Sequence, residues 1–125
     1  MLARSAFLLL AIGLTTVSGC GPAKLDVNKT MELDAGAAKP LILDPQPQAQ
    51  TITVEFESTE SSVNVGIFKE EDGKDLDKLD FAKAIKAEKK SKKGSVSAEV
   101  PAKTGCRVIV ETLAKTSVKL HVTNK

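Results

Sequence analysis

The chain has 125 residues, of which 42% are apolar and 27% are charged, and its formal net charge is +2. This length predicts one small domain and excludes a large multidomain enzyme. A nearly neutral chain without Trp or Tyr is not expected to attract nucleic acid by charge or to stack its bases.

The first twenty residues have the order of a secretory signal. A short start with one positive charge, Arg4, precedes the apolar segment Ala6–Val17, and small residues follow it. The uncharged run 5–23 would nearly cross a bilayer as a helix, but Pro22 would end that helix. We therefore predict a cleaved signal peptide rather than a membrane-spanning anchor.

The segment closes with Val17-Ser18-Gly19-Cys20. An aliphatic residue, two small residues and a cysteine at this place resemble the lipobox of bacterial lipoproteins. The resemblance implies that residues 1–19 are removed and that Cys20 carries diacylglycerol and a further acyl chain such as palmitate. It implies that residues 20–28 tether the domain to a membrane. Gly21 stands where an Asp favours the inner membrane, so the outer membrane is expected in a cell with two membranes.

The expected mature chain, residues 20–125, has 106 residues and a net charge of +1, because Arg4 is removed. Cys106 is then its one unmodified cysteine, so no disulfide can form within the domain. A domain of roughly 100 residues buries enough surface to fold without one.

The rest of the chain alternates between apolar and polar residues, as half-buried strands do. The alternation is clearest around Met31 and Leu33 and over Ile52–Phe56, Val63–Ile67, Val96–Val100, Cys106–Val110 and Val118–Val122. The pattern predicts an all-β domain over residues 29–125, a small antiparallel β-sandwich of about seven or eight strands, jelly-roll or immunoglobulin-like. The short polar link between Gln50–Glu57 and Ser62–Lys69 predicts a hairpin.

Residues 69–94 break the alternation, since 16 of these 26 residues are charged. Acids dominate the first half and lysines the second, so a helix over Asp75–Lys90 would match the helix dipole. The alternative is a strand over Phe81–Ala87, a lysine-rich loop and a strand from Ser95. We favour the strand, because Phe81 fits poorly beside Leu76 and Leu79 on a helical wheel.

Between Thr51 and Asn124, a Thr-Ile-Thr-Val-Glu-Phe strand precedes a strand ending in Asp72-Gly73, a Val100-Pro101-Ala102 turn and two closing strands. This order resembles small bacterial β-sandwich modules similar to pre-peptidase C-terminal domains. The chain departs from them in its lysine-rich insertion and in lacking aromatic residues near the closing strands. The resemblance implies an accessory or interaction module rather than a catalytic one.

The two reactive side chains lack evident partners. His121, the one histidine, alternates with Leu120 and Val122, so we expect it in solvent with no metal or general-base role. Cys106 has the parity of Val108, with Arg107 on the other face, so we expect a small buried hydrophobe. The chain has no phosphate loop, serine elbow, CxxC or HExxH. We predict no catalytic residue, no cofactor and no enzymatic activity.

Two charged segments remain as candidate sites. Calcium needs several converging oxygens, for which the weak candidates are Asp72, Asp75, Asp77 and Asp80, although their spacing does not fit an EF-hand. Lysines could contact anionic headgroups or protect a sheet edge, and the candidates are Lys86, Lys89, Lys90, Lys92 and Lys93.

These features together predict a lipid-anchored protein of the bacterial cell envelope. We expect a non-catalytic module that contacts another envelope protein or a surface polymer and does not bind nucleic acid. The alternative is an envelope protein that binds a small ligand or calcium.

Overall fold

The computed structural model describes residues 24–125, and the signal segment with Cys20 lies outside the described residues. The described chain is all-β, as predicted, with two short 3-10 turns at Leu76–Lys78 and Phe81–Lys83. Its eight strands are β1 (Asp26–Leu33), β2 (Ala38–Leu43), β3 (Gln50–Ser58), β4 (Val63–Lys69), β5 (Lys86–Ser91), β6 (Lys93–Val100), β7 (Cys106–Thr112) and β8 (Thr116–Asn124).

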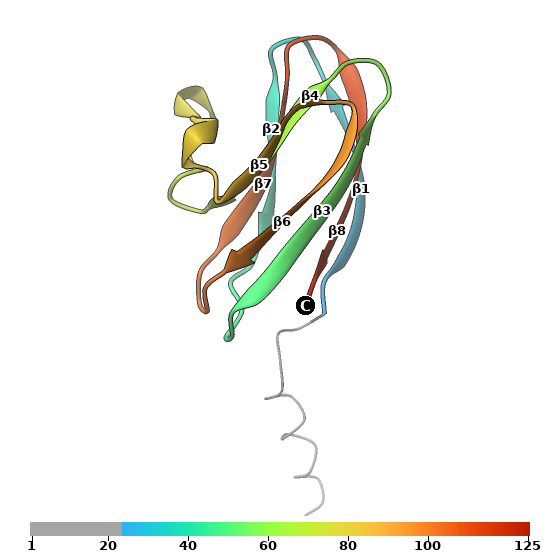
Figure 1. Cartoon of the computed structure of the whole chain (residues 1–125). Helices are drawn as coiled ribbons and strands as arrows, with labels where there is room; N and C mark the ends of the chain where they lie inside the picture. The colour runs from blue at the N-terminus through green and yellow to red at the C-terminus, as the bar shows by residue number, and fades with distance from the viewer. Residues whose placement is uncertain (1–23) are drawn as a thin grey trace, which may run out of the picture.

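The strands form two four-stranded antiparallel sheets packed face to face (Figure 1). The first sheet has the order β1-β8-β3-β6 and the second the order β2-β7-β4-β5. Along the chain, every consecutive pair except β4 and β5 lies in different sheets, which is the arrangement of a jelly roll. The predicted sandwich is therefore confirmed, in the jelly-roll form.

The core lies between the two inner faces and is built almost entirely from aliphatic residues. Val54 is paired with Val96 on one side and with Val122 on the other, and all three are buried. Cys106 is 1% exposed and Val108 is fully buried, so the predicted parity of Cys106 is confirmed. Because β-branched residues suit a pleated, half-buried surface, this composition favours strands over helices.

The predicted hairpin of Gln50–Glu57 and Ser62–Lys69 is wrong, because β3 and β4 lie in different sheets. The link between them wraps around the start of β8. The Thr59 N–H donates to the Ser117 carbonyl at 2.9 Å, and the Thr116 hydroxyl accepts the N–H groups of Glu60 and Ser61. The alternation of apolar and polar residues does not reveal that the chain passes from one sheet to the other between β3 and β4. A strand of either sheet shows the same alternation.

The charged segment also differs from its prediction. A strand is present, as favoured over the long helix, but it begins at Lys86 rather than Phe81 and runs through the lysines expected in a loop. The lysines are tolerated because β5 is an edge strand, whose outer side faces water. At the other end of the domain, β1 begins at Asp26, within the stretch expected to be tether.

On three of the four edge strands of the described chain, charged residues occupy positions whose parity faces the core. On the edge strands β1 and β2, Lys29 is paired with Leu120 and Lys39 with Val110. On the edge strand β5, Lys86 is paired with Ile67 and Glu88 with Val65. Inward-pointing charges on edge strands disfavour pairing with another chain, so the edges at β1, β2 and β5 carry protection against aggregation.

Residues 70–85, which we call the strap, cover part of the outer face of the second sheet (yellow in Figure 1). At the β2 edge of this face, Ile42 stays 58% exposed. Phe68 alternates with the core residue Ile67 and so has the parity of the outer face, yet it is fully buried, as is Ile109 of β7. The ring of Phe81 meets Phe68 edge to face, with centroids 5.1 Å apart. A Cβ on Gly73 would lie 3.0 Å from Ile109 Cδ1, so glycine lets the strap approach the sheet this closely.

Candidate interaction surfaces

The aspartates proposed for calcium do not converge in the structure. Asp75 accepts the N–H of Asp77 at 3.0 Å, and Asp80 accepts the N–H of Ala82 at 2.9 Å. These two carboxylates therefore cap the two 3-10 turns of the strap. Among residues 24–125, no group of three or more His, Cys, Asp or Glu side chains is arranged to hold a metal ion.

Cys106 has the chemistry of a core residue. Burial raises the pKa of its thiol to about 11, because the thiolate loses its hydration in the apolar interior. The thiolate is the reactive form of cysteine, so Cys106 at neutral pH is held almost entirely as the unreactive thiol.

His121 lies on the outer face of the first sheet, as predicted, but it has partners that the sequence did not reveal. Its Nε2 lies 2.8 Å from Asp26 Oδ1, and its Nδ1 lies 3.3 Å from Glu55 Oε1. These contacts arise because β8 runs between β1 and β3. The hydrogen bonds to Asp26 and, to a lesser extent, to Glu55 raise the pKa of His121 above its usual value, since both carboxylates favour the imidazolium form.

A shallow depression of about 470 Å³ lies beside His121 on this face. Its polar lining residues are Asn28, Glu55, Glu57, Lys93, Ser95, Lys119 and His121. In contrast to the second sheet, no segment of the described chain covers this face. The depression therefore presents hydrogen-bonding groups and charges of both signs to solvent.

The lysines singled out in the sequence lie on the edge strands β5 and β6 and in the turn between them. Lys119 of β8 joins them, because Glu57 of β3 is paired with Lys93 on one side and with Lys119 on the other. A second depression, of about 440 Å³, is lined by Glu57, Ser58, Thr59, Lys92, Lys93 and Lys119. We call Lys89, Lys90, Lys92, Lys93 and Lys119 the lysine end.

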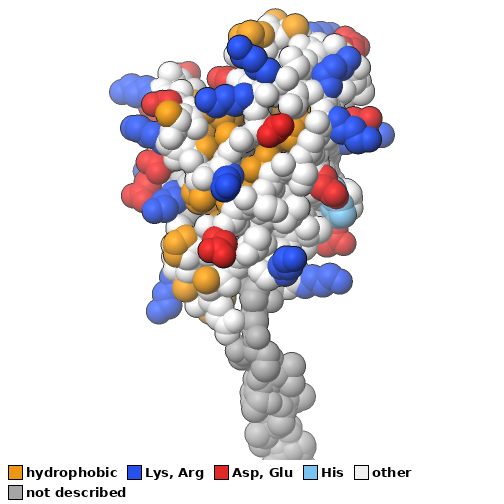
Figure 2. Space-filling view, viewed as in Figure 1, with side chains coloured by type: hydrophobic (Ala, Val, Ile, Leu, Met, Phe, Trp, Pro, Cys, Tyr) orange, Lys and Arg blue, Asp and Glu red, His pale blue; other side chains and the backbone are white. Residues whose placement is uncertain are grey.

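Among the described residues, the lysines of the lysine end make no ion pair within 4 Å. Both ion pairs within 4 Å in the described chain are made by His121. All 16 lysines of the sequence lie within residues 24–125, and none of them has a carboxylate at that distance. Figure 2 shows many of the Lys and Arg side chains of this view over the upper part of the molecule.

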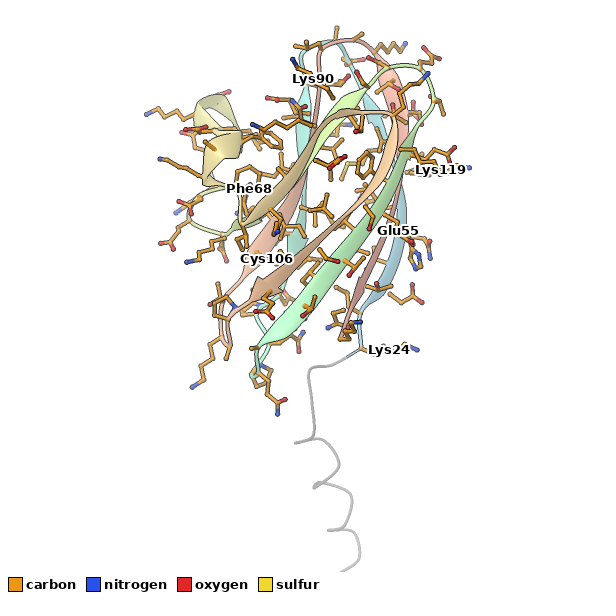
Figure 3. The ribbon with its side chains drawn as sticks, viewed as in Figure 1. Lys24, Glu55, Phe68, Lys90, Cys106 and Lys119 are labelled. Carbon is orange, nitrogen blue, oxygen red and sulfur yellow. The ribbon has the colours of Figure 1, made fainter. Side chains whose placement is uncertain are left out.

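Lys90 of the lysine end and the first described residue, Lys24, lie at opposite ends of the sandwich. Figure 3 shows Lys24 at the lower end, where the chain enters β1, and Lys90 at the upper end. A nine-residue strand such as β3 spans roughly 30 Å at ~3.3 Å per residue. Lys119 is paired with Thr30, four residues after the start of β1, so the lysine end extends from the turn that carries Lys90 part of the way down the first sheet.

Within residues 24–125 there is no helix with the length and hydropathy needed to cross a membrane. Comparison of the chain with protein-family models and with curated proteins finds no match.

Proposed function

We propose that this chain is a lipid-anchored protein of the bacterial cell envelope whose β-sandwich is a non-catalytic interaction module. One observation carries the proposal: Val17-Ser18-Gly19-Cys20 closes an apolar N-terminal segment, and β1 begins only six positions after Cys20. At ~3.5 Å per extended residue, that spacing holds the sandwich within roughly 20 Å of the lipid attached to Cys20. Several acyl chains together give stable anchoring.

The chemistry of the described domain supports a binding role. The Cys106 thiol is buried and its pKa is raised to about 11, so it is poorly suited to act as a nucleophile. His121 has a carboxylate at each ring nitrogen and lies on an open face rather than in an enclosed pocket. What the surface offers instead is unpaired positive charge at the lysine end, which supports an envelope protein or surface polymer as partner.

The proposal is tested by the mass and location of the native protein. We expect a mass equal to residues 20–125 plus diacylglycerol and an acyl chain, and recovery with the membranes, the outer membrane if the cell has two. The variant Cys20→Ser should keep its signal peptide and gain no lipid, while Cys106→Ser should be processed normally. Full-length, unmodified protein in the cytosolic fraction would overturn the proposal.

A further inference from the structure

We propose that the lysine end binds a linear anionic polymer that lies outside the anchoring membrane. This inference rests on the proposed function, because it takes Cys20 as the point of attachment. It adds a class of partner and a place of contact on the domain.

The position of the lysine end favours a partner away from the bilayer. The chain enters β1 at one end of the sandwich, and Lys90 lies at the other (Figure 3). With the lipid at the β1 end, the turn that carries Lys90 faces the space beyond the membrane, and Lys119, paired with Thr30, lies part of the way along the domain. A polymer in that space meets the lysine end first.

The lysine end holds positive charge free to meet a ligand. Its lysines lack a carboxylate within 4 Å among the described residues. Three of them line the depression of about 440 Å³ together with Ser58 and Thr59. Its one acidic lining residue, Glu57, lies between Lys93 and Lys119 in the sheet, so the depression keeps a net positive charge.

The lysines are distributed around an edge rather than over one flat face. Lys93 lies on the outer face of the first sheet, in the row of Glu57, whereas Lys89 and Lys90 belong to β5 of the second sheet. The register of β5 shifts here, Lys90 has a φ of 53°, and its N–H donates to Asn64 Oδ1 at 2.9 Å. A flat bilayer touches one side of such an edge, but a flexible chain can follow it around.

The side chains of the lysine end would select a ligand by its negative charge more than by its shape. Lysine is a compact point charge, whereas arginine forms the planar fork that recognises one phosphate or carboxylate in a fixed geometry. Arg107, the one arginine among residues 24–125, lies in β7 opposite Phe68 and away from this end, so lysines supply its positive charge. They therefore suit a polymer with repeated phosphate or carboxylate groups, bound through summed charge.

Binding is measured on the native protein in a nonionic detergent, by the anisotropy of fluorescent polyphosphate and of fluorescent polyglutamate. We expect binding of at least one polymer, with a Kd that rises steeply with salt. The polymer bound more tightly at equal charge identifies phosphate or carboxylate as the preferred group. No salt-dependent binding of either polymer would overturn the inference.

A matched pair of variants locates the contact. The triple variant Lys89→Gln, Lys92→Gln and Lys93→Gln should raise the Kd at least about tenfold and lower the slope of log Kd against log salt by about 2. The control Lys74→Gln, Lys78→Gln and Lys83→Gln removes the same charge from exposed positions of the strap and should change the Kd less than about threefold. Equal losses in both variants would overturn the inference.

Nanodiscs separate a polymer from a membrane as the partner. The lipid on Cys20 inserts equally into neutral and anionic nanodiscs, so only the lysines distinguish them. We expect phosphatidylglycerol nanodiscs to displace the polymer no better than phosphatidylcholine nanodiscs. Stronger displacement by the anionic discs would assign the lysine end to a membrane and overturn the inference, while the anchor itself is tested separately by the mass of Cys20.

Discussion

The outer faces of the two sheets differ, although both sheets are four-stranded and antiparallel. The strap covers the part of the second sheet that holds Phe68 and Ile109, which are fully buried. The first sheet is bare, and its corresponding positions hold polar residues such as Glu55 and His121. The comparison shows that a β-sandwich gains a small third layer where one segment of the chain supplies an apolar cover, and that the face without a cover remains available for contact with other molecules.

The variant Phe68→Ala should have the largest effect on this difference. It removes a fully buried ring from beneath the strap, and we expect a loss of about 3–5 kcal/mol in the free energy of unfolding. Urea denaturation measures the loss. The matched change on the bare face is Thr53→Ala, at a half-buried position, and it should cost less than about 1 kcal/mol. Similar losses from the two variants would contradict the contrast between the faces.

The variant Gly66→Ala should come next. A Cβ at this position would lie 2.8 Å from Phe68 Cε1 and 3.0 Å from Phe81 Cε2, so the rings must move. We expect a loss of about 1–3 kcal/mol in the free energy of unfolding, from overpacking. In a Phe81→Ala background the loss should shrink, because Phe68 can then turn away. An unchanged loss in that background would place the strain in the backbone of β4 instead.

The variant Phe81→Ala should loosen the strap without opening the sandwich. Phe81 is only partly buried, so we expect a cost of about 1–2 kcal/mol and about tenfold faster tryptic cleavage after Lys74, Lys78 or Lys83. Over the same period, Cys106 should stay unreactive toward a thiol reagent at pH 8, because its burial belongs to the core between the sheets. If Cys106 labelling accelerates together with cleavage, the strap and the sandwich open as one unit.

On the bare face, the pH dependence of His121 should be the smallest effect. Because its pKa is raised in the folded chain, its contribution to stability is fully present below the ordinary histidine pKa of ~6.5. That contribution is lost as the pH rises through the higher folded pKa. An NMR titration of the imidazole should give a pKa above that of a free histidine, and Asp26→Asn should lower it more than Glu55→Gln does. A pKa unaffected by either variant would show that neither carboxylate holds the ring in solution.

The sequence predicted the sandwich and the faces of its strands because alternation is a local property. The burial of Cys106 and the outward position of His121 both followed from parity with their neighbours. The same rule misplaced Phe68. The continuous apolar run Val108-Ile109-Val110 was the available signal for a strand covered on both faces.

The contacts that depend on strand order could not be predicted. His121 meets Asp26 and Glu55 across sequence separations of 95 and 66 residues, and only the order β1-β8-β3 brings them together. The same lack of information produced the false hairpin of Gln50–Glu57 and Ser62–Lys69. Strand periodicity tells which face a residue occupies but does not tell which strand lies beside it.

The pairing of β1 with β8 has a consequence for the order of events during synthesis. Asp26 lies opposite Thr123 in the sheet, so β1 has no partner in its sheet until β8 has left the ribosome. Folding dominated by such distant pairings is slow. A chain that stays unfolded until its last strand emerges remains narrow enough to be threaded through a translocation channel, as the proposed export requires.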